Sequence, residues 1–278
     1  MANDLTEDYV LGGNIDAAAT ATWNEDPGNP GTYFGFDPVG DHTTPFTGSF
    51  DGGGYTITSL TINRPTESYI GLFGETDCGD IEDVGLVTCS ISGEGYVGAL
   101  VGKGTSTGIS DCYATGAIDG TLDYVGGLIG DALTAIEDCY STCTVTVTGG
   151  ASKIVYCGGF VGNVYTEETI TDCYSTGNVT ITSDSYIRAI GGFVGETSGV
   201  TITKCFATGD VTATAGDKIE SIGGFAGSFD TETITNSYAT GDITVLANDI
   251  AWGDIGGFVG YFSDTVIDDC YSIGSITE

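Results

Sequence analysis

Short apolar runs, separated by glycine, threonine and acidic residues, recur along most of the chain. In one repeat they fall at residues 192–194, 200–205 and 210–213. Such runs are too short for helices, and no stretch shows a 3.6-residue apolar period bounded by capping residues. Valine, isoleucine, threonine and tyrosine are frequent in them, and these residues favour strands. The pattern predicts an all-β protein with three short strands in each repeat.

The spacing of two sequence blocks predicts how these strands are arranged. A strand-like block of the form Gly-x-hydrophobic-hydrophobic-Gly, or close to it, occurs in seven copies that lie 28 to 33 residues apart. A second block follows each copy and reads Ile-x-Asp-Cys-Tyr in its best versions, such as residues 170–174. Short strands at a fixed period predict a parallel β-helix (β-solenoid) with one coil per 28–33-residue repeat. Each strand then pairs with its copy in the next coil.

The residues of these blocks resemble the GLUG-motif family, which is named after a block seen here as Gly71-Leu72-Phe73-Gly74. Residues 9–16 and 46–57 are similar to the lead-in strand and first coil of that family. The resemblance implies a β-solenoid in an extracellular setting, as in large bacterial and archaeal surface proteins, adhesin-like proteins and proteins with an immunoglobulin-cleaving metallopeptidase domain. It implies no set of catalytic residues. We expect residues 1–45 to form a lead-in strand and N-terminal cap, and residues 46–278 a solenoid of seven GLUG-like repeats.

Equivalent residues of successive coils form columns along a solenoid, and neighbouring residues of a strand face opposite sides. If Val179 points inward, regular alternation places Cys173 inside and Tyr174 outside. Ile170 is apolar but would then face solvent, so we expect a bend between Ile170 and Asp172. A bend at Gly177 instead would reverse the orientation of the whole strand.

The column that contains Tyr174 is the predicted binding feature of the chain. Its members are Tyr113, Tyr140, Tyr174, Phe206, Tyr238 and Tyr271. Six aromatic rings at coil spacing would form a flat stripe suited to sugar rings or to another protein surface. The alternative is a self-stacking ladder that only stabilises the sheet.

Two further columns run beside the aromatic one. The cysteine column, predicted to be buried and mostly reduced, holds Cys112, Cys139, Cys173, Cys205, Ser237 and Cys270. Disulfides are the alternative, and the better candidates for them lie outside the column at Cys78, Cys89, Cys143 and Cys157. The acidic column holds Asp111, Asp138, Asp172 and Asp269, with Lys204 and Asn236 in the same position. We expect a solvated row there, with no dedicated cofactor or metal site and with loose Ca²⁺ binding left open.

Charge excludes several classes of partner. The chain has 39 acidic and 6 basic residues and a formal net charge of −33 at pH 7, so it would repel nucleic acid and anionic membranes. The chain contains no run of 18 apolar residues, so the sequence predicts no membrane-spanning helix. The first residues lack the basic segment and the apolar segment that make up a signal peptide. We therefore expect either a piece of a longer secreted protein or a chain that reaches its place without a leader.

Catalysis is not expected. The single histidine, His42, and the lack of an HExxH block exclude a zincin, and no nucleophile elbow with a histidine partner is present. The sequence favours an extracellular or cell-surface module with an adhesive or structural, filament-forming role. The alternative is a polysaccharide-binding or polysaccharide-cleaving protein of the tailspike kind. The expected partners are neighbouring repeats or a second copy at the C-terminal coil, and a glycan or surface protein.

Overall fold

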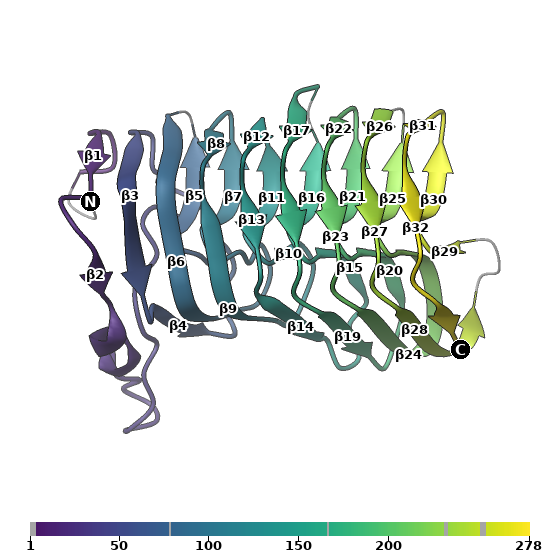
Figure 1. The fold of residues 1–278 in the computed structure, drawn as a ribbon. Helices are drawn as coiled ribbons and strands as arrows, with labels where there is room; N and C mark the ends of the chain where they lie inside the picture. The colour runs from purple at the N-terminus through teal and green to yellow at the C-terminus, as the bar shows by residue number, and fades with distance from the viewer. Residues whose placement is uncertain (1–3, 78, 166, 231–232, 251–253) are drawn as a thin grey trace.

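The computed structural model describes residues 4–77, 79–165, 167–230, 233–250 and 254–278, which form a rod of stacked coils (Figure 1). The two ends of the chain lie at opposite ends of the rod. Pairing between the named strands is parallel throughout, as for Ile136 with Ile170 and Ile170 with Ile202. The predicted all-β, parallel β-solenoid is confirmed.

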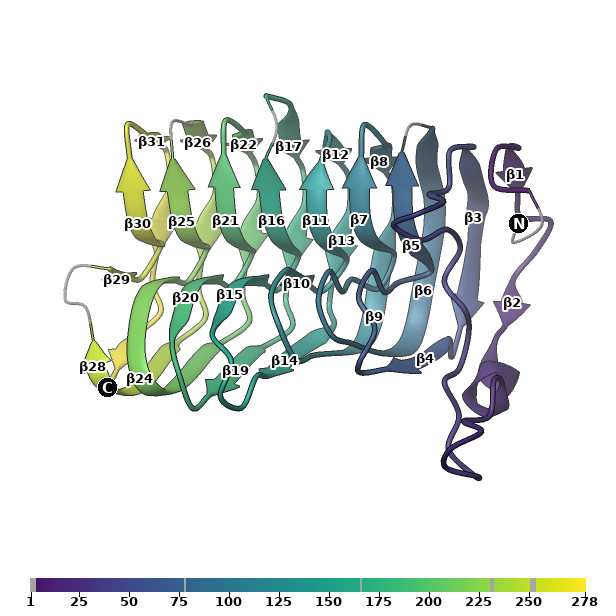
Figure 2. The same cartoon turned by 180° about the vertical axis from the view of Figure 1, so that it is seen from behind.

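One side of the rod is a seven-stranded parallel sheet whose neighbours are successive repeats (Figure 2). Its strands are β5 (Phe73–Asp77), β7 (Val101–Thr105), β11 (Ile129–Leu133), β16 (Val161–Tyr165), β21 (Val194–Ser198), β25 (Ala226–Asp230) and β30 (Val259–Ser263). Because each strand begins one residue before the last glycine of a glycine-rich block, this sheet carries the repeat period most regularly.

A second, larger sheet wraps the remaining sides in four columns of short strands. The first column after the flat sheet holds β8 (Gly108–Ser110), β12 (Ile136–Glu137), β17 (Thr169–Thr171), β22 (Thr201–Thr203), β26 (Thr233–Thr235) and β31 (Val266–Asp268). The next holds β13 (Tyr140–Ser141), β18 (Tyr174–Ser175), β23 (Phe206–Ala207), β27 (Tyr238–Ala239) and β32 (Tyr271–Ser272), and β9 (Tyr113–Gly120) begins in it. The third holds β14 (Thr144–Thr148), β19 (Val179–Ser183), β24 (Val211–Gly223), β28 (Ile243–Ile250) and β33 (Ile276–Thr277). The last holds β10 (Val125–Gly126), β15 (Ile154–Gly158), β20 (Ile187–Gly191) and β29 (Ile255–Gly256).

The N-terminal end of the rod is built from less regular elements. These are β1 (Tyr9–Val10), β2 (Ile15–Asp16), the 3-10 helix η1 (Ala18–Thr22), β3 (Phe50–Thr58), β4 (Thr61–Arg64) and β6 (Asp80–Gly93). The loop before β3 lies along the edge of the flat sheet, where Val39 pairs with Phe73 and Phe46 with Thr76. Apart from η1, the described residues contain no helix, and none of them forms a helix long and apolar enough to cross a membrane.

The glycine-rich block forms a corner rather than the strand we expected. In the fifth repeat β20 ends at Gly191 and β21 begins at Val194, so the block spans the turn between them. A Cβ atom built on Gly191 would lie 2.1 Å from the carbonyl oxygen of Val194. Only glycine fits this position, because the chain folds back on its own backbone there.

The interior is filled by columns of like residues. One is a column of isoleucines that includes Ile109, Ile170 and Ile234, all of which are buried. Another is a ladder of phenylalanine rings, in which Phe160 and Phe193 are stacked at 4.8 Å and Phe193 and Phe225 at 4.9 Å. Because each coil buries its apolar side chains against the coils on both sides, no coil has an independent core.

Candidate functional site

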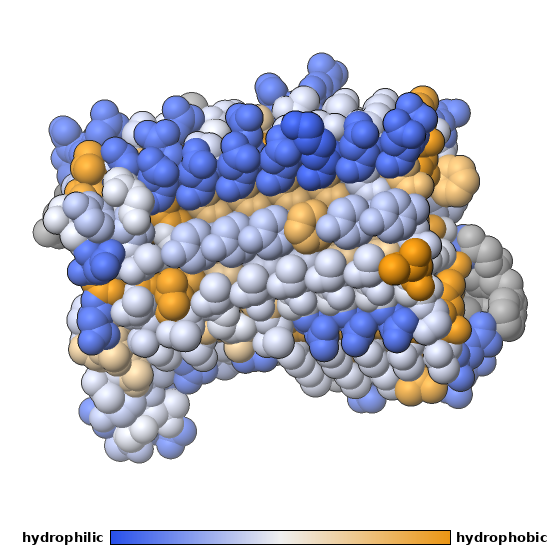
Figure 3. Space-filling view, viewed as in Figure 1, coloured by the Kyte–Doolittle hydropathy of each residue, from blue (hydrophilic) through white to orange (hydrophobic). Residues whose placement is uncertain are grey.

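The structure brings all six predicted aromatic residues into one column on the outside of the rod. We call this column, Tyr113 to Tyr271, the outer ladder. Neighbouring ring centroids are 4.7 to 5.2 Å apart and neighbouring ring planes differ by 1° to 6°. The rings are half-buried except that of Tyr271, which is exposed. In the space-filling view the rings form a continuous stripe beside a strongly hydrophilic row (Figure 3).

A left-handed turn before each ring sets its orientation. Asp172 has φ +54°, and the equivalent residues of the other coils have φ between +51° and +57°. The turn interrupts the regular alternation of inward-facing and outward-facing side chains. Both Ile170 and Cys173 therefore point into the core, while Tyr174 points out. The predicted bend and the predicted orientation are confirmed. Aspartate and asparagine tolerate this backbone conformation better than most residues, which explains their frequency in the acidic column.

Stacking limits what the outer ladder can bind. Each inner ring has a parallel neighbour on both faces, so ring edges and hydroxyl groups are what it presents to solvent. At the start of the ladder the ring of Tyr113 lies over Gly85, where a Cβ atom would come within 2.2 Å of it. Tyr271 ends the ladder and is 53% exposed. A sugar ring can therefore stack only at this last position, whereas contacts along the rest of the ladder must be made edge-on.

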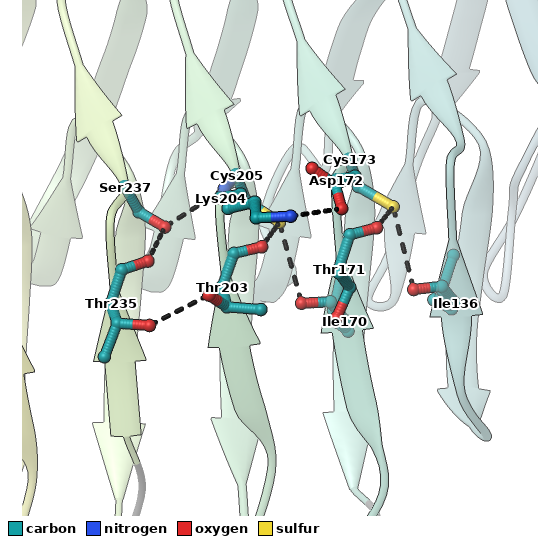
Figure 4. A network of polar contacts seen from close by, with 10 residues as sticks. All are labelled: Ile136, Ile170, Thr171, Asp172, Cys173, Thr203, Lys204, Cys205, Thr235 and Ser237. Atoms are coloured by element: carbon teal, nitrogen blue, oxygen red, sulfur yellow. Dashed lines mark hydrogen bonds and ion pairs between the residues drawn. The ribbon is translucent and has the colours of Figure 1, made fainter.

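The acidic column lies beside the outer ladder. A surface depression of about 320 Å³ between the two is lined by Asp83, Asp111, Asp138, Tyr113 and Tyr140. Further along, the ammonium Nζ of Lys204 lies 3.1 Å from Oδ2 of Asp172, which compensates one carboxylate of the row (Figure 4). Within the described part of the chain, no three histidine, cysteine or carboxylate side chains converge as metal ligands would.

The cysteine column lies directly behind the outer ladder and faces the core. Burial raises the pKa of the Cys112, Cys139 and Cys173 thiols well above the ordinary value. The Cys173 thiol donates to the carbonyl oxygens of Thr171, at 3.2 Å, and of Ile136 in the preceding coil, at 3.7 Å (Figure 4). The column thus lies inside, as predicted.

Serine can take the place of cysteine in this column and still form hydrogen bonds with its neighbours. The hydroxyl of Ser237 accepts the N–H of Cys205 at 3.1 Å and donates to the carbonyl of Thr235 at 2.8 Å. Outside the column, Cys89, Cys143 and Cys157 are buried and unbridged. The fourth candidate for a disulfide, Cys78, lies outside the described residues.

A second aromatic column was not anticipated from the sequence. His42, Tyr69, Tyr96 and Tyr124 stack at 4.4 to 4.8 Å, and Tyr156 follows at 5.0 Å with a tilt of 46°. The four tyrosines have φ between +52° and +65° at the corner before the glycine-rich block. A signal was available, because each of them stands two residues before a glycine of that block.

The second column covers a line of polar residues on the flat sheet. Glu75 is buried and contacts His42 Nδ1 at 2.8 Å and Lys103 Nζ at 3.7 Å. Asp131 is buried as well, and it accepts a hydrogen bond from the Asn163 amide at 2.8 Å. Burial raises the pKa of the Asp131 carboxyl, although the bond from Asn163 opposes the rise. These groups satisfy one another between coils, so they stabilise the register of the stack.

Comparison with known sequences identifies the repeat. The GLUG motif matches residues 155–181, 188–212 and 220–244. The chain carries GLUG repeats. The resemblance to the GLUG-motif family is thereby confirmed, and the matched segments include the corner glycine Gly191 described above.

Two relatives share part of this sequence and are much longer than the chain. Over 165 residues, 57% of the chain, the sequence is 36% identical to Halomucin of Haloquadratum walsbyi. Over 82 residues, 28% of the chain, it is 42% identical to a "Putative Gly-rich membrane protein" of Evansella cellulosilytica. The matched parts cover 2% and 9% of the lengths of these two relatives.

A solved structure shares the fold of the GLUG rod. It is described as a "putative immunoglobulin A1 protease" from Bacteroides ovatus, and its TM-score is 0.66 over 97% of this chain and 78% of that one. The two sequences are 20% identical. At this level the likeness concerns the fold alone.

Proposed function

We propose that this chain is a non-catalytic, extracellular module of a cell-surface protein with a structural and adhesive role. The observation that carries the proposal is the outer ladder, an unbroken column of six rings that runs along the rod in register. A column of this kind strengthens the contact between the neighbouring coils that it spans. The names of the two relatives, Halomucin and a "Putative Gly-rich membrane protein", support the setting.

No cofactor is part of this proposal. The acidic row would hold Ca²⁺ only as a loosely bound counter-ion, because its carboxylates are spaced along the rod rather than gathered around one point. The net charge of −33 keeps such a rod soluble and apart from its neighbours at low salt.

The adhesive part of the proposal uses the edges and hydroxyl groups of the outer ladder. It is tested by replacing Tyr140 and Tyr174 with phenylalanine, which removes two hydroxyls and keeps the stack, as Phe206 does naturally. Binding of the wild type to an array of glycans and surface proteins should be lost in this variant while its urea unfolding curve stays unchanged. If the wild type binds nothing on the array, the adhesive part of the proposal is wrong and only the structural role remains.

The surface location and the lack of catalysis need separate measurements. Antibodies against the chain should label intact cells that produce it as strongly as permeabilised ones, and labelling only after permeabilisation would contradict the proposal. Incubation with neutral and acidic polysaccharides should release no new reducing ends. Release of such ends by the wild type, and less release by an Asp111→Asn and Asp138→Asn variant, would show that the module is an enzyme.

A further inference from the structure

One asparagine on the outside of the rod stands in a sequence that accepts glycans. Asn178-Val179-Thr180 is the one place in the chain where an asparagine is followed, two residues on, by serine or threonine with no proline between them. This is the acceptor motif for N-linked glycosylation, which takes place on exposed asparagines of secreted chains. Asn178 directly precedes β19, which lies in the middle part of the rod (Figure 1). The coils on both sides of the motif are therefore present in the structure.

The strand pattern places this motif on the outer surface. Val179 is buried, so its two neighbours in the alternating strand point outward. Both Asn178 and Thr180 are exposed. The carboxamide of the first and the hydroxyl of the second thus face the same side of the strand, and both are accessible.

The side-chain oxygen of Asn178 has a structural partner in the next coil. Its Oδ1 accepts a hydrogen bond from the backbone N–H of Asp210 at 3.0 Å. Asp210 and Asp242 hold the equivalent position in the next two coils. Their carboxylates accept the same bond from the coil that follows each of them, at 2.9 and 2.8 Å. Asn178 therefore does with an amide oxygen what the next two coils do with a carboxylate oxygen.

The amide nitrogen of Asn178 is not needed for this contact. Because the Asp210 N–H is a donor, the oxygen of Asn178 must face it, and Nδ2 points away. Within the described ranges of the chain, Nδ2 of Asn178 makes no hydrogen bond of its own. An N-linked sugar is attached to Nδ2 and leaves Oδ1 in place. The bond to Asp210 can therefore form whether or not a glycan is present.

The surroundings of Asn178 leave room for a bulky group. The four nearest outward positions are two along the strand and two in the coils on either side, namely Thr176, Thr180, Thr144 and Asp210. All four are exposed, and none carries a large side chain. A glycan on Asn178 thus extends into solvent, and it does not prevent this coil from packing on its neighbours.

We propose that Asn178 is the acceptor of an N-linked oligosaccharide. In the transfer, Nδ2 attacks the anomeric carbon of an oligosaccharide carried on a lipid diphosphate. The C–N bond forms as the bond from that carbon to the diphosphate oxygen breaks. Nδ2 loses one of its two protons to a base of the membrane transferase, and the lipid diphosphate leaves. The inference rests on the proposed extracellular location, because such transferases act on chains that cross a membrane.

Mass spectrometry of the chain isolated from the cells that produce it tests the proposal. Trypsin cuts after Lys153 and Arg188, so Asn178 lies in a peptide of residues 154–188. We expect this peptide to carry the added mass of several sugar units, with the first sugar left on Asn178 after fragmentation. An unmodified peptide, or a sugar found on a hydroxyl group instead, would overturn the proposal. Labelling of intact cells by antibodies reports the surface location in either case, so the two proposals fail separately.

Substitutions separate the glycan from the fold. Asn178→Asp keeps the acceptor oxygen, as in Asp210 and Asp242, and should abolish the modification with a nearly unchanged urea midpoint. Thr180→Val keeps Asn178 but breaks the motif and should abolish the modification as well, whereas Thr180→Ser should retain it. Asp242→Asn completes the same motif with Thr244 two coils further on and should add a second glycan. If the Asp242→Asn site is modified while Asn178 stays bare, the cells glycosylate this face of the rod and the proposed site is wrong.

Discussion

Phe206 lies flat against Tyr174, with ring centroids 4.7 Å apart and ring planes that differ by 2°. Tyr238 covers the opposite face of Phe206 at 4.9 Å and 1°. Phe206 is also the one ring of the outer ladder that has no hydroxyl, so its presence shows that stacking alone satisfies this position. The rings on both sides depend on it for one covered face each.

Replacing Phe206 with alanine should therefore destabilise the rod through two lost ring contacts. Each is worth about 0.5–1.5 kcal/mol, which gives a loss of about 1–3 kcal/mol in the free energy of unfolding. Phe206→Tyr should be nearly neutral, because it keeps both contacts. Urea unfolding followed by circular dichroism measures both. Equal stability of the alanine variant and the wild type would show that the ladder adds nothing to the stack.

The salt bridge between Lys204 and Asp172 gives a prediction for the acidic column. Lys204→Asp would place like charges on neighbouring coils and should lower stability by about 0.5–1 kcal/mol at low salt, with most of the loss recovered in about 1 M NaCl. Lys204→Asn is the control, because Asn236 already occupies the same left-handed position, at φ +51°. It should stay within about 0.5 kcal/mol of the wild type, since the bridge is exposed. A loss for Lys204→Asp that does not shrink with salt would show that charge repulsion is not its cause.

The fold could be predicted largely from the sequence because a solenoid turns periodicity directly into contacts. Once the period is known, residues one repeat apart must be neighbours, as Tyr140 and Tyr174 are. Alternation within a strand then gave the correct side for Cys173 and Tyr174. The corner at Gly191 was mistaken for a strand, because close approach of Gly191 to the Val194 carbonyl depends on backbone angles that the pattern of apolar residues does not encode.

Of the candidate site, the outer ladder could be predicted from the sequence, but the second aromatic column could not. The period shows which residues stack along the rod but not which columns lie side by side across a corner. Glu75 and His42 are 33 positions apart and belong to different parts of the first coil, yet they form a hydrogen bond. The positions of the tyrosines over Glu75 and Asp131 could not be predicted, because tyrosine rarely adopts the positive φ that it has there.

The corner glycine gives a prediction for the repeat itself. Gly191→Ala would bring a Cβ atom within 2.1 Å of the Val194 carbonyl oxygen and 2.6 Å of the Phe225 carbonyl oxygen. Both are backbone atoms that cannot move alone, so a loss of at least about 1–3 kcal/mol is expected. Gly12→Ala is the control, because nothing lies within 4 Å of a Cβ atom built there. Thermal unfolding should separate the two variants, and equal melting temperatures would mean that the corner is more adaptable than its geometry indicates.

The buried thiols predict that the rod loses stability in mild alkali. Burial raises the pKa of Cys112, Cys139 and Cys173 in the folded chain, while a thiol in the unfolded chain has a pKa of about 8.5. Below pH 8.5 both states hold the protons and stability is constant. Above it the unfolded chain releases protons that the folded chain retains, so stability falls by up to about 1.4 kcal/mol per pH unit for each thiol.

Urea midpoints measured between about pH 7.5 and pH 9.5 in the presence of a reductant test this slope. The window stays below the ordinary tyrosine pKa of about 10, so the ladders contribute little to it. A variant with Cys139→Ser and Cys173→Ser should show a shallower slope, because serine does not titrate there and Ser237 shows that the column accepts it. If that variant keeps the slope of the wild type, the alkaline loss must come from other groups. If the wild type shows no slope at all, the thiols are not buried in the folded chain.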